Sequence, residues 1–385
     1  MPETKPDLLI DAEGVCNACR NMDGRRDLDW EARREELVRI IDRLRSRDGR
    51  NYDCIVPVSG GKDSHFQVLR VLELGLNPLC VTATTDMLSD IGRRNIENLK
   101  RQGVDYVEVT TNPTVRRRIN RLALTQVGDI SWAEHITIFT IPVRIAVQFG
   151  IPLIVWGENS QNEYGGPAEA AAEHLLTRRW LEEFGGLLGL RVSDLPKHGI
   201  APEQLIQYTY PSDDELRRVG VTGLFLGSYL PWDGYQNALY AQAHGFTTYP
   251  STVEGSLVNY ENLDNYQTGI HDYFKFLKYG FGRATDLACL HVRRGRLSRE
   301  DALRLTRRHD GQFPWKYLGC RLEDILLEID MSLEEFIRVC DRFTNKKLFV
   351  CASDGRLVKD AHGNLTKINY DNVDASFPAA KTLPV

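Results

Sequence analysis

A six-residue stretch after a short apolar run has the composition of a phosphate-binding loop. The apolar run ends at Val58, and the stretch reads Ser59-Gly60-Gly61-Lys62-Asp63-Ser64. Phe66, Leu69 and Leu72 then recur at helical spacing. The two glycines therefore lie between a predicted strand and the N-terminus of a predicted helix, where backbone N–H groups can approach an anion without interference from a Cβ. The pattern predicts a phosphate site, and an ordinary strand-to-helix turn is the alternative.

The spacing of this stretch excludes two common phosphate motifs. A Walker A loop needs a glycine where Val56 stands and a serine or threonine where Asp63 stands. The dinucleotide fingerprint needs separated glycines, and Gly60 and Gly61 are adjacent. The stretch resembles the PP-loop of the ATP pyrophosphatase superfamily, in which ATP is cleaved to AMP and pyrophosphate while a carbonyl oxygen is adenylated. The resemblance implies ATP as the bound nucleotide.

Each residue of this loop has a candidate role in ATP binding. The backbone N–H groups of Ser59 to Lys62, with the hydroxyl groups of Ser59 and Ser64, would bind the phosphates that leave as pyrophosphate. Lys62 would neutralise their charge. Asp63 is the candidate ligand for Mg²⁺, which prefers carboxylate and phosphate oxygens.

The adenine and ribose are expected at the carboxyl ends of the first, second and fourth predicted strands, because open α/β sheets bind ligands there. The residues placed at these ends are Thr82, Thr84, Gly157, Glu158 and Asn159. Glu158 is also a candidate to position ammonia or to accept a proton. The alternative is purely structural, since threonine suits strands and Gly-Glu-Asn can simply end one.

The elements that must position these residues alternate between strand and helix. Further strands are predicted at Leu79–Ala83, Tyr106–Val109, Ile151–Trp156 and Gly223–Gly227, with helices at Trp30–Arg47 and Ile91–Gln102 and a helical region over 113–149. Pro142 is expected to end or kink a helix in that region. The alternation predicts an α/β fold, an open parallel sheet with helices on both faces, of the PP-loop ATP pyrophosphatase (adenine nucleotide alpha hydrolase-like) type.

The chain is expected to divide into four parts. Residues 1–28 form a segment with a Cys-x-x-Cys pair, residues 29–230 the PP-loop domain, residues 231–350 an aromatic-rich, mainly helical region for substrate or partner, and residues 351–385 a tail with hairpin-like turns. Within the second part, residues 160–200 look like an insertion or lid with a helix near 168–184. Ser298 and Ser332 are predicted helix caps in the third part.

Composition limits the classes of protein that fit. The 385 residues are 42% hydrophobic and 26% charged, which is typical of a globular protein with room for about two domains. No apolar stretch approaches the roughly 18 residues of a membrane helix, and residues 1–30 are too polar for a signal peptide. We therefore predict a cytoplasmic protein without a membrane partner. The net charge of −5 argues against nucleic acid as the main partner.

The cysteine pair Cys16-x-x-Cys19 is a candidate zinc half-site, because a structural zinc ion takes four ligands. Residues that could complete it are Cys289, His291, Cys320 and Cys351, none at a persuasive spacing. The alternative is a pair of reduced thiols in a turn.

Several further stretches narrow the resemblance to one family. They are Gly14–Cys19, Asp29–Arg33, Gly92–Asn95, Trp156–Asn159, Trp232-Asp233, Gly269–Asp272 and Lys278–Asp286. Together they resemble the N-acetyl sugar amidotransferase family of surface-polysaccharide and flagellin-sugar biosynthesis, from the first residues to about Phe343. The segment Trp156–Gly166 is most similar to the pseudaminic acid branch. Family members carry another cysteine pair just before a Met-Pro-Glu-Thr-like stretch, at which this chain begins, so two of four zinc ligands are expected to be missing through a late start site or a real loss.

This resemblance implies a reaction and a set of partners. The acetamido group of a nucleotide-linked sugar would become an acetamidino group, as ATP yields AMP and pyrophosphate. Among the aromatic residues of 228–282, most are expected to pack a core, while Tyr229 or Trp232 could stack on the sugar or its base. Arg283 could bind a phosphate or carboxylate, with a surface ion pair as the alternative.

The nitrogen source follows from what the sequence lacks. An N-terminal glutaminase needs cysteine directly after Met1, but residue 2 is Pro, and neither Cys16 nor Cys320 has the setting of a triad glutaminase. Ammonia is therefore expected from solution or from a partner, and the resemblance implies a separate glutaminase with a barrel-type companion. Two other functions stay open: a PP-loop tRNA thiolase, and an ATP-binding scaffold without catalysis.

Overall fold

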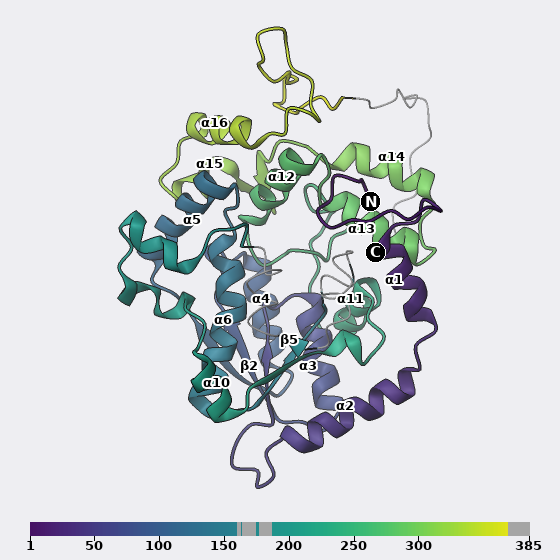
Figure 1. The fold of residues 1–385 in the computed structure, drawn as a ribbon, viewed down its shortest axis with the longest axis vertical. Helices are drawn as coiled ribbons and strands as arrows, with labels where there is room; N and C mark the ends of the chain where they lie inside the picture. Colours follow the sequence, from purple (N-terminus) through teal and green to yellow (C-terminus); the bar gives the residue numbers. More distant parts are fainter. Residues whose placement is uncertain (160–162, 164–174, 177–186, 369–385) are drawn as a thin grey trace.

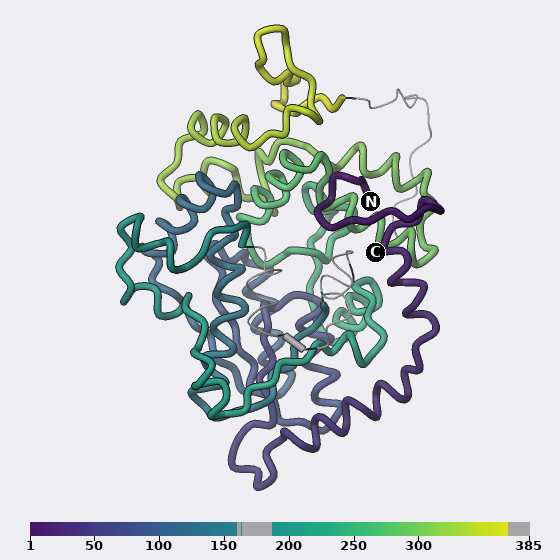
Figure 2. Tube along the Cα trace, in the orientation of Figure 1, coloured from purple at the N-terminus to yellow at the C-terminus, as the bar shows by residue number. Residues whose placement is uncertain are grey.

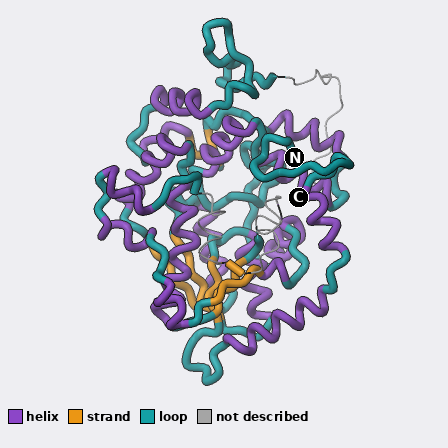
Figure 3. The backbone as a smooth tube through the Cα atoms, viewed as in Figure 1, coloured by secondary structure: helices purple, strands orange, loops and turns teal. Residues whose placement is uncertain are grey.

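The described residues form a six-stranded sheet with helices packed around it (Figures 1 and 3). The structure, a computed structural model, describes residues 1–159, 163, 175–176 and 187–368. The strands are β1 Cys54–Pro57, β2 Pro78–Ala83, β3 Asp105–Val109, β4 Leu153–Trp156, β5 Leu175–Leu176 and β6 Thr222–Phe225. Their order is β3-β2-β1-β4-β6-β5, and every pair is parallel except β5 with β6. The predicted open parallel sheet is confirmed, with an antiparallel strand added at one edge.

Alternating side chains along the strands explain why helices cover both faces. Cys54 and Val56 of β1 pack in one cluster with Phe66 and Leu37 of the helices on that side. Ile55, between them, belongs to a different cluster that includes Ile141 and Val143. Successive residues of a strand point to opposite faces, so a run that is apolar throughout must be buried on both.

The helices of the first two thirds of the chain include those predicted before and after the PP-loop. They are α1 Asn17–Arg26, α2 Trp30–Leu44, α3 Lys62–Glu73, α4 Asp90–Lys100, α5 Pro113–Val127, α6 Trp132–Phe149, α10 Asp213–Val219 and α11 Gly234–Ala243, with 3₁₀ helices η1 Val192–His198, η2 Pro202–Tyr208 and η3 Leu226–Ser228. In the structure α3 and α4 contribute to the core on one face of the sheet, whereas α6 packs on the other.

Two expectations for these elements need correction. The break in the helical region lies at Gly128, which has a left-handed φ of 65° and closes α5, while α6 continues through Pro142. Packing of the neighbouring Ile141 and Val143 on the sheet offsets the hydrogen bond that a proline removes. In the segment 160–200, β5 lies where a helix was predicted near 168–184, because these two residues pair with β6. The rest of that predicted helix lies outside the described residues.

The C-terminal region is mainly helical, as predicted (Figure 1). Its elements are α12 Thr268–Tyr279, α13 Arg283–Arg293, α14 Arg299–His309, β7 Lys316–Tyr317, β8 Cys320–Arg321, α15 Leu322–Leu327 and α16 Leu333–Phe343. Ser298 caps α14 and Ser332 caps α16 through their side chains. Isolated antiparallel bridges such as Phe349 with Lys367 give the tail its hairpin-like turns.

The N-terminal segment contacts the C-terminal region. The Thr4 hydroxyl donates to the Tyr279 carbonyl over 2.5 Å, and Arg26 donates to the Arg293 carbonyl over 3.1 Å. Figure 2 shows this N-terminal segment passing beside the helices that follow residue 280. Nowhere in the described chain is there a helix with both the length and the apolar character needed to cross a membrane.

Candidate active site

The predicted phosphate loop connects the end of β1 to the first turn of α3. Gly61 is the N-cap of α3 and offers no side chain to cap it. The first N–H groups of a helix have no partner inside the helix, so an uncapped N-terminus is suited to an anion. The loop is held from within, because the Ser59 N–H donates to the Ser64 hydroxyl over 3.0 Å. The loop thus presents helix N–H groups without a side-chain cap, as the predicted phosphate site requires.

Gly60 is required by both its backbone and its surroundings. Its φ is 89°, a conformation that residues with a Cβ rarely adopt. A Cβ at this position would lie 2.8 Å from Ile96 Cγ1 and 3.1 Å from the Ile96 nitrogen. The loop therefore packs directly on α4, and glycine is the residue that fits.

Lys62 is buried at the start of α3 between two acidic side chains. It is 5% exposed, pairs with the neighbouring Asp63 and lies 2.7 Å from Glu261 Oε1. Burial would lower the pKa of Lys62, but the charges of Asp63, Glu261 and Glu158 raise it well above its ordinary value. Asp63 also accepts a hydrogen bond from Asn237 over 2.8 Å. Lys62 is thus a fixed cation beside the loop.

A cavity of about 310 Å³ opens at the carboxyl end of the sheet, next to the loop. It lies where β1 and β4 are neighbours and the strand order changes direction, the place at which open α/β sheets bind ligands. The predicted site residues that line it are Ser59, Ser64, Thr82, Thr84, Gly157 and Glu158. Asn159 lies beside it, in a small recess with Glu158 and Trp232. Residues from three strand ends therefore meet around one space.

Thr82 and Gly157 are held by hydrogen bonds to neighbouring backbone groups. The Thr82 hydroxyl donates to the Val58 carbonyl over 2.6 Å, which ties β2 to the loop. The Gly157 carbonyl accepts the Gly227 N–H over 3.0 Å, and a Cβ on Gly157 would lie 3.1 Å from the Trp232 ring. Both positions shape the cavity wall.

Glu158 is held in place by a tryptophan. The Trp232 indole N–H donates to Glu158 Oε2 over 2.8 Å. Burial, and then the charge of Asp63, raise the pKa of Glu158 to about 8. A carboxyl group with such a pKa can exchange a proton near neutral pH.

Three further acidic residues at this site were missed by the sequence analysis. Glu134 of α6 and Asp264 line the cavity, and Glu261 faces the loop. Burial raises the pKa of Glu134 to about 7 and also raises the pKa of Asp264. The available signals were an acid in the otherwise apolar segment 132–149 and an acidic turn among the aromatic residues. Neither signal predicts that these three side chains lie at the carboxyl end of the sheet.

A family model described as "LPS biosynthesis protein WbpG-like, C-terminal domain" matches residues 245–360, which include Glu261, Asp264 and helices α12 to α16. Residues 245–360 are therefore similar to this domain and are called the WbpG-like domain below. This match confirms the resemblance to a family of surface-polysaccharide biosynthesis. A search of the curated proteins finds no match.

Two solved structures are similar to part of the chain. The NMN synthetase from Francisella tularensis has 11% identity and a TM-score of 0.26, and the match covers 50% of this chain and 92% of that one. The ammonia-dependent NAD synthetase from Campylobacter jejuni has 11% identity and a TM-score of 0.28, with 59% of this chain and 100% of that one covered. These TM-scores are too low to carry an argument.

The WbpG-like domain holds one of the predicted substrate residues, and the other two precede it. Tyr229 is 2% exposed and Trp232 is 4% exposed, both within the core that includes Phe66. Arg283 lies 3.1 Å from Asp272 and lines a different cavity of about 230 Å³. The structure therefore brings Trp232 to the site as the support of Glu158 and does not place Arg283 there. Contact of these residues with substrate stays a prediction.

The predicted zinc half-site lies apart from the cavity. The Cys16 and Cys19 sulfur atoms are 3.5 Å apart. Within the described ranges, no group of three or more clustered donors includes either cysteine. None of the candidates named for completing the site, Cys289, His291, Cys320 and Cys351, joins such a group either. Zinc at this pair stays a prediction.

Proposed function

We propose that the protein is an ATP-dependent amidotransferase that converts the acetamido group of a nucleotide-linked N-acetyl sugar into an acetamidino group. Surface-glycan biosynthesis, of the lipopolysaccharide or flagellin-sugar type, is the proposed context. One observation carries the proposal. Lys62, in a PP-loop that leads to a helix N-terminus without a side-chain cap, lies 2.7 Å from Glu261 of the WbpG-like domain.

The loop is suited to the triphosphate of ATP. Its anion-binding features are the free helix N-terminus of α3, the Lys62 ammonium and the Ser59 and Ser64 hydroxyl groups that face the cavity. Lys62 is at present balanced by Asp63 and Glu261. When ATP binds with a metal ion, the ion would bind the two carboxylates. Lys62 would then be free of them and would pair with a phosphate group.

The donor set fits Mg²⁺. Asp63, Glu158 and Glu261 all interact electrostatically with Lys62, and hard oxygen donors are the ligands that Mg²⁺ prefers. Asp63 and Glu261 would hold the ion, which would neutralise the pyrophosphate as it leaves.

The proposed chemistry solves the problem that an amide is a poor electrophile. The acetamide oxygen attacks the α-phosphorus of ATP, and the bond to pyrophosphate breaks. Ammonia then adds to the activated carbon and loses protons, and the C–O bond breaks to release AMP, which keeps the former amide oxygen. In this scheme the ionised fraction of Glu158 accepts one of these protons, since a pKa of about 8 lets the carboxyl exchange protons near neutral pH. The pseudaminic acid branch is the proposed sugar class.

The ammonia is proposed to come from a separate glutaminase with a barrel-type companion. Two of the described cysteines support this: Cys54 and Cys80 are buried, and burial raises their thiol pKa values. Such thiols are poor nucleophiles.

The test is a reaction with ATP, Mg²⁺, an ammonium salt and UDP- or CMP-linked N-acetyl sugars. The proposal expects pyrophosphate release that depends on one of the sugar nucleotides, and a product whose mass shows oxygen replaced by NH. Release that depends on tRNA would instead indicate a thiolase. No release under any of these conditions would indicate an ATP-binding scaffold.

The variant Lys62→Met tests the placement of the triphosphate. Turnover should fall by at least about a hundredfold, because a preorganised charge at the leaving group is lost. Asp213→Asn, an exposed acid in the first turn of α10, is the control and should keep the wild-type rate. Near-normal turnover of a folded Lys62→Met protein would show that the phosphates bind elsewhere.

A further inference from the structure

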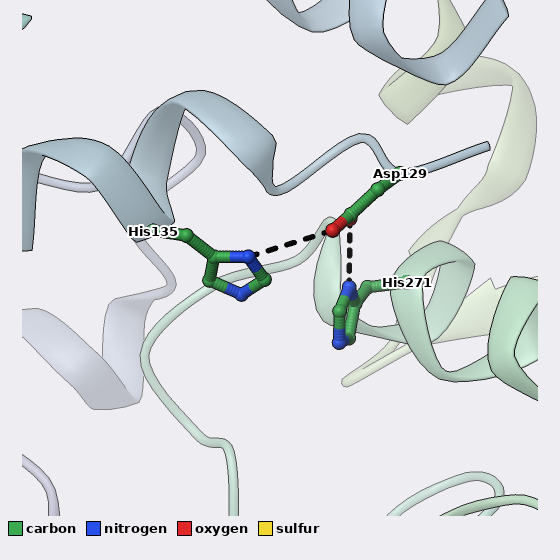
Figure 4. Close-up of side chains that lie close together, drawn as sticks. All are labelled: Asp129, His135 and His271. Carbon is green, nitrogen blue, oxygen red and sulfur yellow. Dashed lines mark hydrogen bonds and ion pairs between the residues drawn. The ribbon is translucent and has the colours of Figure 1, made fainter. Parts of the chain in front are cut away.

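Three side chains outside the proposed active site converge on one point (Figure 4). Asp129 Oδ1 lies 2.8 Å from His271 Nδ1, and Asp129 Oδ2 lies 3.4 Å from His135 Nδ1. Both imidazole rings turn their Nδ1 atoms toward the carboxylate. All three donor atoms lie within 4.8 Å of one another, and no other group of this kind occurs among the residues that the structure describes.

Each donor is positioned by a different element. Asp129 follows Gly128, whose left-handed conformation turns the chain between α5 and α6, and its Oδ1 accepts the Ser131 N–H over 2.9 Å. His135 is in the first turn of α6 and His271 is in the first turn of α12. The carboxylate side chain is 5% exposed, whereas each imidazole is 26% exposed. The donors are therefore fixed, and the rings leave a path from solvent.

We propose that Asp129, His135 and His271 bind a divalent transition-metal ion, with Zn²⁺ the best match. Two imidazole nitrogens and one carboxylate oxygen are a donor set that suits Zn²⁺, whereas Mg²⁺ and Ca²⁺ prefer oxygen donors alone. With metal–ligand bonds of about 2.1 Å, tetrahedral donors lie about 3.4 Å apart. The 3.4 Å between Asp129 and His135 equals that value, and the 2.8 Å between Asp129 and His271 is shorter, so small side-chain movements would admit the ion. A fourth position would be left for water.

The site would join two parts of the molecule. Asp129 and His135 belong to the α5–α6 corner of the PP-loop part, and His271 belongs to the WbpG-like domain. His135 also follows Glu134, which lines the cavity and accepts a hydrogen bond from Asn265 over 2.6 Å. An ion here would hold α12 against α6 at the margin of the proposed nucleotide cavity.

The competing account needs no metal, since one carboxylate can bridge two imidazole groups by hydrogen bonding alone. Binding measurements separate the two accounts. The full chain is prepared with Cys16→Ser and Cys19→Ser, which removes the predicted zinc half-site, and is dialysed against buffered Zn²⁺. The proposal expects one equivalent of bound Zn²⁺ by elemental analysis.

Ligand variants in the same background show where that ion lies. Asp129→Asn and His271→Gln should each weaken Zn²⁺ binding by at least about tenfold, because a direct ligand is lost. His309→Gln, a partly buried histidine outside the group, should bind as the parent does. Equal affinity in all three variants, or no stoichiometric Zn²⁺ in the parent, would overturn the proposal.

Crystals of the intact protein soaked in Zn²⁺ give a test that does not depend on the folding of variants. The proposal expects an anomalous difference peak between the Asp129 carboxylate and the two Nδ1 atoms. A well-ordered trio without a peak, or a peak at other residues only, would refute it.

Discussion

Gly60 is the single position on which the shape of the phosphate loop depends most. Replacing it by alanine combines a left-handed backbone, which costs about 1–2 kcal/mol, with a Cβ 2.8 Å from Ile96 Cγ1. We expect Gly60→Ala to lower the free energy of unfolding by about 2–3 kcal/mol and to abolish ATP-dependent pyrophosphate release. Urea unfolding and a pyrophosphate assay measure the two effects.

Gly75 supplies the matched control for this variant. Its φ is 72°, but a Cβ there would meet nothing within 4 Å. Gly75→Ala should therefore show only the backbone cost and keep its activity. If both variants lose the same stability and both stay active, contact with Ile96 is not what restricts the loop.

Glu158 should give the protein a recognisable pH dependence. Its folded-state pKa of about 8 exceeds its ordinary value of 4.5, so the folded protein holds an extra proton between these pH values. The stability that this carboxyl contributes is present below pH 4.5 and is lost as pH rises through about 8. Glu158→Gln cannot ionise, so its free energy of unfolding should fall less with pH than that of the wild type, by at most about 1.4 kcal/mol per pH unit.

Urea unfolding at pH 5, 6, 7 and 8 measures this difference between variant and wild type. Glu35→Gln removes an exposed carboxylate of α2 and should follow the wild-type curve. A constant difference between Glu158→Gln and the wild type over the whole range would mean that the carboxyl ionises normally in the folded state.

Site residues that are contiguous in the sequence could be predicted, whereas those brought together by tertiary packing could not. Ser59 to Ser64 were predictable because strand, glycines and helix are contiguous, and their types define the chemistry. Glu261 reaches Lys62 across about two hundred residues of chain, and only tertiary packing brings it there. Tyr229 or Trp232 was predicted to stack on the sugar or its base, which stays a prediction. The sequence did not show that the Trp232 indole N–H would hold Glu158.

Helix α4 shows how packing can outweigh intrinsic helix preference. A Cβ on Gly92 would lie 2.7 Å from Asp264 Cα and 3.1 Å from the Asp264 carbonyl oxygen. Alanine gains up to about 1 kcal/mol over glycine within a helix, but backbone atoms of the facing segment cannot easily move away. We expect Gly92→Ala to destabilise the protein by about 1–2 kcal/mol and to weaken ATP binding, because Asp264 lines the cavity.

Gly24 of α1 is the control, because the same substitution there should not lower the stability. A Cβ there meets nothing within 4 Å, so Gly24→Ala should be neutral or stabilising by up to about 1 kcal/mol. Thermal unfolding of the two variants, with isothermal titration of an ATP analogue, measures both effects. A Gly92→Ala protein as stable as Gly24→Ala would show that α4 does not pack closely on residue 264.

Sequence periodicity predicted most helices and strands. It did not predict the features that tertiary contacts determine, such as where a helix ends or which strands pair. The strands β1, β2, β4 and β6 are short runs of mainly apolar residues that are buried in the sheet, whereas β3, at the sheet edge, is only partly buried. Pro142 was expected to end or kink a helix, and it does not end α6. The sequence does not show that Ile141 and Val143, on either side of Pro142, pack on the sheet. The pairing of β5 with β6 joins residues about fifty positions apart, which no local pattern reports.

At the scale of the whole molecule, the PP-loop part and the WbpG-like domain are joined by buried hydrogen bonds. The Ser89 N–H donates to the Asp264 carbonyl over 3.0 Å, and the Tyr266 N–H donates to the Met87 carbonyl over 3.0 Å. Asn95 adds two bonds to the backbone of Thr247, of 2.9 and 2.8 Å. Because Asp264, which takes part in one of these bonds, also lines the cavity, ligand binding there should stabilise both parts.

Asn95→Ala tests whether the two parts unfold together. The substitution leaves the N–H and the carbonyl of Thr247 without their partner, which should cost about 2 kcal/mol. If the parts form one cooperative unit, hydrogen exchange in α3 and in α12 should speed up by the same factor, and ATP with Mg²⁺ should slow both again. Asn51→Ala, which removes a 2.8 Å bond to the Phe149 carbonyl within the PP-loop part, should cost less than about 1.5 kcal/mol. Faster exchange confined to α12 in the Asn95 variant, with α3 unchanged, would show instead that the WbpG-like domain opens on its own and that the nucleotide site does not depend on it.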